Sequence, residues 1–310
     1  MQPCICQVTD TFHYYVDYYE KPAEGTEAVY HIRVFKEQPA DAYWKRELRD
    51  RHGVLISSGK VKDPQGMQKE GDYTFYNFNG SISGTGHYEN GKKEGEWQDL
   101  YESGKPSSKY HYHLGIMAGS NKSWYDNGNI NDLFELDNAG NGKGLGYYED
   151  GKIKYEGNFS AGLKKGTWKY YYDQAGQQES MEADFEKDSL LSSRCFTKDG
   201  QPQKYGCFYE KEAIFPGGDK AWVRYLVDEL SNKPSGKYVK GRDATYTAIV
   251  TFRVATDGTL HDIKVENPNI SKLDKIAESV IRNSPLWIPA IQYNQPVNAY
   301  RRQPITFVAE

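Results

Sequence analysis

Long hydrophobic segments are absent from this chain of 310 residues. Apolar residues make up 37% of the sequence, and the mean hydropathy is −0.83. A membrane-spanning helix needs about 18 or more consecutive apolar residues, so we expect no membrane span in these residues. Residues 1–4 also lack the hydrophobic core of a secretion signal. Two alternatives follow: a cytoplasmic protein, or a protein whose signal was removed.

Neither sign of charge dominates the composition. The 39 Lys and Arg residues against 43 Asp and Glu residues give a formal net charge of −4 and a pI near 6.0. Nucleic-acid binding relies on a basic surface that neutralises phosphates. The charge balance therefore disfavours nucleic acid as a partner.

Cysteine is scarce, with four residues in the chain: Cys4, Cys6, Cys195 and Cys207. Cys195 and Cys207 flank a turn at Gly200 at almost equal distances. They could face each other across a hairpin and form a disulfide in an oxidising compartment, and two free thiols are the alternative. Cys4 and Cys6 are too close in sequence for an unstrained mutual bridge.

The patterns of common catalytic and cofactor sites are missing as well. Residues 140–146 are Gly-rich but lack the Lys-Ser/Thr ending of a phosphate loop, and we interpret them as a repeat turn. His111 and His113 would share one strand face, but no third ligand has suitable spacing for a metal. No Ser-His-Asp or Cys-His arrangement can be placed. We expect no catalytic residue, no cofactor and no metal.

Tyrosine and glycine are abundant, with 26 and 30 residues, and they are arranged as a repeat. Glycines that close turns recur at intervals of about 11–14 residues or twice that, each shortly after an aromatic residue: Gly80, Gly91, Gly104, Gly128, Gly151, Gly162, Gly176 and Gly200. Such glycines close hairpins, and aromatic and β-branched residues suit half-buried strands. Residues 1–210 are therefore predicted to form a meandering antiparallel sheet.

A second marker supports a unit of two strands and two turns, about 24 residues long. Trp97 and Trp168 both follow a Gly-x pair and lie 71 residues apart, close to three units, with Trp124 between them. We expect Trp97 and Trp168 to be buried. Residues 43–49 could be helical by propensity, but we favour strands there because Gly53 and Gly59 fall at repeat-like places.

The turns resemble those of bacterial MORN-type repeats, in which the pattern Tyr-x-Asn/Asp-Gly-Lys recurs. The matching segments are Tyr88-Glu89-Asn90-Gly91-Lys92 and Tyr148-Glu149-Asp150-Gly151-Lys152. Some bacterial MORN-type proteins carry an antitoxin label, so the resemblance includes an antitoxin-like role among its implications.

Residues 211–310 have a different pattern and predict an αββαβ domain. Two apolar stripes with helical spacing cover residues 222–230 and 273–281, the second preceded by a capping box of Ser271 and Asp274. A strand with one apolar face leads through the Asp257-Gly258 turn to a returning strand. The last strand is expected over residues 303–308, with Ile305 and Phe307 facing inward.

These residues resemble the TonB C-terminal domain family. The resemblance is carried by five short motifs in the family's order: Phe215-Pro216-Gly217-Gly218, Phe252-x-Val254-x-x-Asp257-Gly258, Pro285-x-Trp287-x-Pro289, Asn294-Gln295-Pro296-Val297 and Pro304-Ile305-x-Phe307. A glycine usually occupies the position of Asn294. The resemblance implies a periplasmic or cell-envelope protein that offers a sheet edge to a peptide of an outer-membrane transporter or receptor.

We therefore predict a non-catalytic binding or scaffold protein that engages a protein partner by β-strand addition. The chain ends shortly after its last strand, so the edge strand is the expected binding site: Gln303, Pro304, Ile305, Thr306, Phe307 and Val308. Arg301 and Arg302 are expected to steer an acidic partner. The alternative is an interaction protein that binds through the repeat sheet, with the Tyr170-Tyr171-Tyr172 run exposed as its contact surface.

Overall fold

The computed structural model describes residues 11–17, 19–24, 28–174, 176–231, 233, 238–239, 244–266 and 268–308. The chain divides into two compact units, here called unit 1 (Met1–Gln177 and Ala183–Ser192) and unit 2 (Gln178–Glu182 and Ser193–Glu310). Cys4, Cys6 and most of the loop expected at 232–241 lie outside the described residues.

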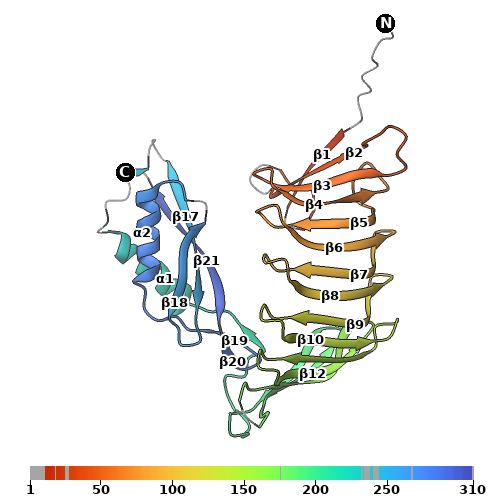
Figure 1. Ribbon diagram of the computed structural model, residues 1–310. Coiled ribbons are helices and arrows are strands. Elements are labelled where there is room, and N and C mark those ends of the chain that lie inside the picture. The colour runs from red at the N-terminus through yellow and green to blue at the C-terminus, as the bar shows by residue number, and fades with distance from the viewer. Residues whose placement is uncertain are drawn as a thin grey trace. The chain divides into compact units, whose positions relative to one another are not determined.

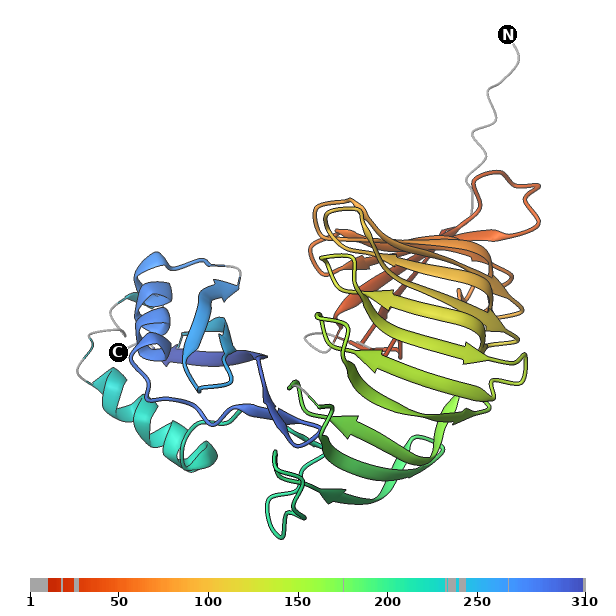
Figure 2. The ribbon, with the colours of Figure 1, turned by 60° about the horizontal axis from the view of Figure 1, so that its bottom comes forward.

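The predicted meandering sheet is confirmed: fifteen strands pair in the order in which they follow along the chain (Figure 1). Figure 2 shows that the sheet is twisted and curved. Its strands are β1 (Thr11–Val16), β2 (Tyr30–Phe35), β3 (Trp44–Asp50), β4 (Leu55–Val61), β5 (Lys69–Tyr76), β6 (Ile82–Glu89), β7 (Lys92–Leu100), β8 (Pro106–His113), β9 (Ile116–Trp124), β10 (Ile130–Leu136), β11 (Gly142–Tyr147), β12 (Ile153–Ser160), β13 (Leu163–Tyr171), β14 (Glu179–Glu186) and β15 (Ser189–Cys195).

The Gly-x-Trp marker marks a β-bulge followed by a buried aromatic ring. Gly95 and Gly166 have φ near +66° and +69°, and the pairing register of their strands shifts beside them. A glycine in this conformation is typical of a bulge that bends a strand. Trp97 and Trp168 follow two residues later and are 7% and 0% exposed, so the prediction that both are buried is confirmed.

Each buried ring lies against a glycine of the preceding strand. A Cβ atom added at Gly86 or Gly157 would lie 2.2 or 2.1 Å from the nearest atom of Trp97 or Trp168. Each indole also donates a hydrogen bond to a main-chain carbonyl one strand away, Trp97 Nε1 to His87 O at 3.2 Å and Trp168 Nε1 to Asn158 O at 3.1 Å. The indole ring therefore packs directly on the glycine, and the position needs a residue without a side chain.

The repeat unit formed by β8 and β9 exchanges the sizes of these two positions. Gly119 forms the bulge of β9 with φ near +69°, but the residue two positions later is Asn121, which is fully buried. Its Oδ1 accepts a hydrogen bond from His111 N at 2.8 Å. Tyr110 occupies the place that glycine has in the other units. Trp124, taken from sequence as the marker between the two tryptophans, is instead half-buried at the end of β9.

The repeat tyrosines link successive repeat units through hydrogen bonds between the turns at the ends of the strands. Tyr101, Tyr125 and Tyr148 each begin a turn, and their hydroxyl groups donate to main-chain carbonyls 22 or 23 residues later. The partners are Trp124 O at 2.6 Å, Tyr147 O at 2.7 Å and Tyr171 O at 2.7 Å. A tyrosine therefore stands before the turn glycine because its hydroxyl reaches the next unit.

Of two further predictions about the sheet, one is confirmed and one is wrong. The preference for strand over helix near residues 43–49 is confirmed by β3. The interpretation of residues 140–146 as a turn is wrong beyond Asn141, because Gly142–Tyr147 is β11. The physical reason is close packing: a Cβ at Gly144 or Gly146 would lie 2.6 or 2.3 Å from the ring of Phe159 or Tyr155.

Unit 2 contains a three-stranded antiparallel sheet in the order β18-β17-β21 and two helices. Helix α2 packs on β17 and β18 and against α1 (Figure 1). A second small sheet has the order β16-β19-β20. The bounds are β16 (Glu210–Lys211), α1 (Gly218–Ser231), β17 (Thr245–Val254), β18 (Leu260–Glu266), α2 (Ser271–Arg282), β19 (Ala290–Gln292), β20 (Gln295–Val297) and β21 (Ala299–Val308).

The two helices lie where the stripes predicted, but their local details differ. On α1, Trp222 is buried, whereas Val223 and Val227 are 58% and 61% exposed, because the core contacts the opposite side of the helix. The capping box of Ser271 and Asp274 does not form. Asp274 is buried and accepts a hydrogen bond from the Tyr246 hydroxyl instead, so its carboxylate ties α2 to the sheet.

The motif around Asn294 is a hairpin rather than a connecting loop. Tyr293 and Asn294 have φ near +53° and +64° and join β19 to β20. Asparagine tolerates this left-handed conformation, so it can occupy a position that otherwise favours glycine. Its side chain adds what glycine cannot, a hydrogen bond to Gln203 Oε1 at 3.0 Å.

Candidate strand-docking site

Strand β21 forms one edge of the sheet β18-β17-β21. It spans ten residues, longer than the predicted 303–308, and pairs with β17 without a register shift. Ile305 and Phe307 are 1% and 2% exposed and anchor the strand in the core. Pro304, Thr306 and Val308 are exposed on the opposite face, and Gln303 is half-buried.

The register shows which main-chain groups of β21 point away from β17. Pro304 lies opposite Ile249 and has no N–H, so it fits a position whose donor would face outward. The Thr247 and Thr306 hydroxyl groups lie 2.9 Å apart, as expected where side chains are close in a non-hydrogen-bonded pair. The outward donors are therefore the N–H groups of Tyr300, Arg302, Thr306 and Val308.

Both arginines near this edge are already engaged. Arg301 Nη1 forms an ion pair with Glu212, and Arg302 Nε lies 2.7 Å from a carboxylate oxygen of Glu266. Arg301 Nε is buried and has no hydrogen-bond partner among the described residues. The positive charge expected to steer an acidic partner is thus largely compensated within the chain.

A hollow of about 680 Å³ adjoins the beginning of β21. It lies between β16, β19 and β21, and its lining includes Glu210, Gln292, Tyr300 and Arg301. Tyr300 is 75% exposed. A chain added along the edge of β21 would find room for side chains here. Near the other end of the strand, burial raises the pKa of Tyr246, and its hydrogen bond to Asp274 acts in the same direction.

Cys195 and Cys207 are joined by a disulfide, with their Cα atoms 5.5 Å apart. Gln203 N donates to Cys195 O at 2.8 Å inside the loop that the disulfide closes. The bridge therefore fixes the segment that follows β15. Gln203 in turn accepts from Asn294.

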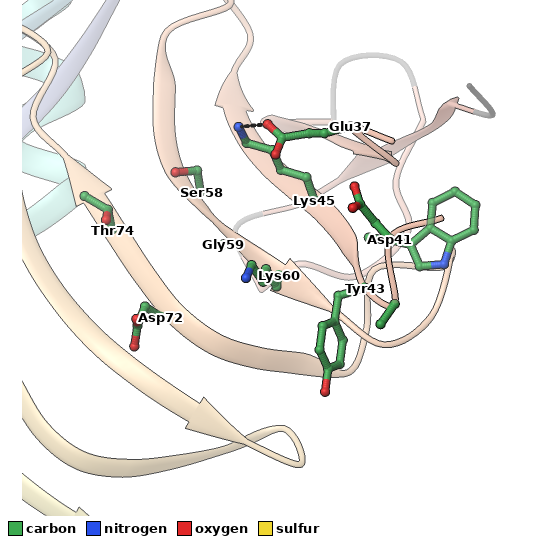
Figure 3. A pocket seen from close by; sticks show the side chains of 11 residues that line it. Glu37, Asp41, Tyr43, Lys45, Ser58, Gly59, Lys60, Asp72 and Thr74 are labelled. Atoms are coloured by element: carbon green, nitrogen blue, oxygen red, sulfur yellow. Dashed lines mark hydrogen bonds and ion pairs between the residues drawn. The ribbon is translucent and has the colours of Figure 1, made fainter. Parts of the chain in front are cut away.

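Unit 1 contains a pocket of about 430 Å³ beside β3, β4 and β5 (Figure 3). Lys45 Nζ and a carboxylate oxygen of Glu37 form an ion pair of 2.6 Å across it, and Asp72 pairs with His87 at 2.7 Å. Ser58 contacts the Tyr76 hydroxyl at 3.3 Å. The charged groups of Lys45, Glu37 and Asp72 are therefore engaged in ion pairs.

Three further observations concern the described residues only. No group of three or more His, Cys, Asp or Glu could hold a metal ion, and His113 is paired with Glu94 at 3.1 Å. No helix is both long and apolar enough to cross a membrane. Tyr170 and Tyr172 are 0% and 7% exposed, so the tyrosine run expected as an exposed contact surface is largely buried.

Sequence reasoning missed a polar cluster inside the repeat sheet. Asp132 accepts hydrogen bonds from Ser123 Oγ at 2.7 Å, from Asn131 Nδ2 at 3.0 Å and from the Tyr155 hydroxyl. Because the carboxylate is surrounded by donors of the chain itself, the cluster is a structural network.

The chain was compared with known proteins at two levels. No protein-family model matches the sequence, and no curated protein matches it.

Proposed function

We propose that this chain is a non-catalytic binding protein of the cell envelope that captures an extended segment of a protein partner as an additional strand along β21. The observation that carries the proposal is the ten-residue edge strand, which is anchored by two buried side chains and has β17 as its only strand neighbour among the described residues. Strand addition gains affinity from main-chain hydrogen bonds, and side-chain pockets select the partner.

Two features support an edge that is selective rather than generally adhesive. Pro304 removes one outward donor in the middle of the strand, which limits indiscriminate pairing. The hollow beside Tyr300 and Arg301 offers space for side chains of the added strand. Because both arginines are ion-paired, we assign most of the affinity to the main chain and little to charge.

The disulfide supports an envelope location. Disulfides persist in oxidising compartments such as the periplasm and are uncommon in reducing ones. Together with the TonB-like motifs, the bridge between Cys195 and Cys207 favours a periplasmic partner, such as the peptide of an outer-membrane transporter or receptor.

Proline substitution along the edge tests the proposal. Thr306→Pro and Val308→Pro each remove an outward N–H, and each lost hydrogen bond of about 1 kcal/mol should weaken binding by about fivefold. Thr306→Ala keeps the main chain and should change affinity less than about twofold. Binding of the full chain to fluorescently labelled N-terminal peptides of outer-membrane transporters would be measured by anisotropy at low and high salt.

The controls separate docking from folding. Each proline variant must keep the thermal transition of the parent. If folded Thr306→Pro and Val308→Pro bind as tightly as the parent, the edge is not the docking site. A strong loss of affinity at high salt would show that charge, rather than the main chain, dominates recognition.

A further inference from the structure

Strand β15 is the last strand in the order of the fifteen-stranded sheet, and its side chains are unusually exposed. All residues from Ser189 to Arg194 are exposed, and Leu190 and Leu191 are 42% and 68% exposed. Edge strands of soluble proteins are normally protected by lysine, proline, a bulge or a covering segment. Residues 189–193 read Ser-Leu-Leu-Ser-Ser and contain neither lysine nor proline.

Two hydrogen bonds show which main-chain groups of β15 face outward. Phe196 N donates to Ser180 O of β14 at 3.0 Å, so Phe196 faces the neighbouring strand. Cys195 O accepts from Gln203 N at 2.8 Å, so Cys195 faces the other way. Because the direction alternates along a strand, Ser189, Leu191 and Ser193 direct their N–H and C=O groups away from the sheet.

One end of this edge is closed and the other is open. At Cys195, the segment containing Gln203 and the disulfide to Cys207 occupies the outward side. The Ser193 hydroxyl lies 3.7 Å from Cys207 Sγ, next to the closed end. Among the described residues, β15 has no strand partner on its outward side, where Ser189, Leu191 and Ser193 direct their main-chain groups. Such an edge is complementary to another short strand of similar composition.

We propose that β15 pairs antiparallel with β15 of a second copy of this chain, with the two-fold axis at Leu191. This register places Leu191 opposite its own copy and Ser189 opposite Ser193 of the copy, which gives three hydrogen-bonded pairs. The Leu190 side chains of the two copies become diagonal neighbours within contact range. An isologous interface of this kind closes on itself and does not propagate.

The charges at the ends of the strand agree with this register. In this register Arg194 of one copy, already ion-paired with Glu182 of its own chain, lies opposite Asp188 of the other, so no like charges face each other. A five-residue strand pair is smaller than a standard protein interface, so we expect a reversible dimer with a dissociation constant between about 1 µM and about 1 mM.

Sedimentation equilibrium of the full chain tests the association. The chain would carry Cys4→Ser and Cys6→Ser, so that free thiols cannot link copies. The average mass should rise from 35.4 kDa towards about twice that value as the concentration increases to about 1 mM. A constant mass of 35.4 kDa up to that concentration would overturn the proposal.

Charge substitution at the two-fold axis identifies the surface. Leu191→Lys and Leu191→Glu each place like charges opposite each other and should weaken association at least about tenfold. An equimolar mixture of the two variants should restore it, because the mixed pair is complementary. Leu114→Lys, a change at another exposed leucine of unit 1 (58% exposed), should leave association unchanged.

Leu191→Pro adds an independent test, because it removes an outward donor and spares the pairing with β14. The variant should keep the parent's circular dichroism spectrum and lose association. If both charged variants still associate like the parent, another surface mediates the contact and β15 is excluded. Failure of the mixture to associate would likewise exclude the two-fold register, whatever the outcome at β21.

Discussion

The repeat sheet and unit 2 bury their aromatic and apolar residues through contacts of very different sequence separation. In the sheet, each strand pairs with its neighbours in the chain, and the tyrosine hydrogen bonds reach one unit ahead, as from Tyr101 to Trp124. In unit 2, β17 pairs with β21, and the Tyr225 hydroxyl reaches Val280 O, 55 residues away. The sheet is therefore a sum of local steps, whereas unit 2 closes only as a whole.

This difference has a consequence for stability. A repeat array approximates a sum of unit and interface terms, so damage in one unit of the sheet should spread mainly to its neighbours. A single closed core unfolds cooperatively, so damage at one place lowers the stability of the whole core. The following changes test this contrast, from the largest expected effect to the smallest.

Replacing Trp168 by Ala should have the largest effect. The residue is fully buried, packs against Phe159 and Phe185 and donates to Asn158 O, so the expected loss is roughly 3–5 kcal/mol. Hydrogen exchange should show lost protection in β12 and β13, with the sheet β18-β17-β21 and the two helices of unit 2 unchanged. Replacement of the half-buried Trp124 is the control. Equal loss of protection in both units would contradict the proposed local character of the sheet.

Opening the disulfide between Cys195 and Cys207 should act on unit 2. The bridge spans 12 residues, and loop-closure entropy assigns about 3 kcal/mol to such a loop. Cys195→Ser with Cys207→Ser should lower the thermal midpoint of unit 2 and leave the exchange protection of β5 to β9 unchanged. A calorimetric scan of parent and variant checks this, and an unchanged scan would show that the loop is held without the bridge.

Gly157→Ala should cost roughly 1–3 kcal/mol by overpacking. The added methyl group would meet the indole of Trp168 at 2.1 Å, and both groups are held in a strand. Asn158→Ala, at the exposed neighbouring position, should have little effect. Chemical denaturation of the two variants provides the comparison. Equal midpoints would mean that the ring can move away from the glycine.

Tyr125→Phe should cost only about 1 kcal/mol, since one hydrogen bond to Tyr147 O is lost. Burial raises the pKa of Tyr125 to about 12, and the Asp132 charge acts in the same direction. An unfolded tyrosine titrates near pH 10, so this group's contribution is complete below pH 10 and is lost as pH rises towards 12.

The alkaline titration separates the tyrosine from other groups. In parent protein, stability measured by urea unfolding should fall between about pH 10 and pH 12, and the slope should be smaller in Tyr125→Phe. Tyr110, whose pKa burial also raises to about 12, remains in both proteins. Identical slopes in parent and variant would show that Tyr125 does not contribute to the alkaline loss.

The periodic part of the fold was accessible from sequence because its causes are local. Turn glycines such as Gly104 and Gly128 have positive φ, and the tyrosine three residues earlier makes the same hydrogen bond in each unit. The same reasoning failed where packing across strands decides. The strand β11 was taken for a turn because its glycines lie under rings of the neighbouring strands, such as Phe159 and Tyr155 of β12.

The candidate sites could be predicted only in part from the sequence. Ile305 and Phe307 were assigned inward from the alternation of the last strand, and both are buried. The sequence could not show which N–H groups of β21 face outward, because this follows from the pairing of Pro304 with Ile249. It also could not show the ion pairs of Arg301 and Arg302, because Glu212 and Glu266 are neighbours only in space. The exposed edge at Leu191 was missed because a strand's place in a sheet is not written in its own residues.

The sequence by itself determined the alternation of strands and turns, the two helices and the position of Cys195 and Cys207 on either side of a turn, whereas their bridge comes from the structure. These features follow from main-chain preferences and from contacts within about one repeat unit. The tertiary structure decided the long-range partners: Asp274 bonds Tyr246 in place of a cap, Asn121 replaces a tryptophan opposite Tyr110, and β21 lies at a sheet edge. Such choices depend on which groups meet after the chain has closed on itself, when the burial of each polar atom requires a partner.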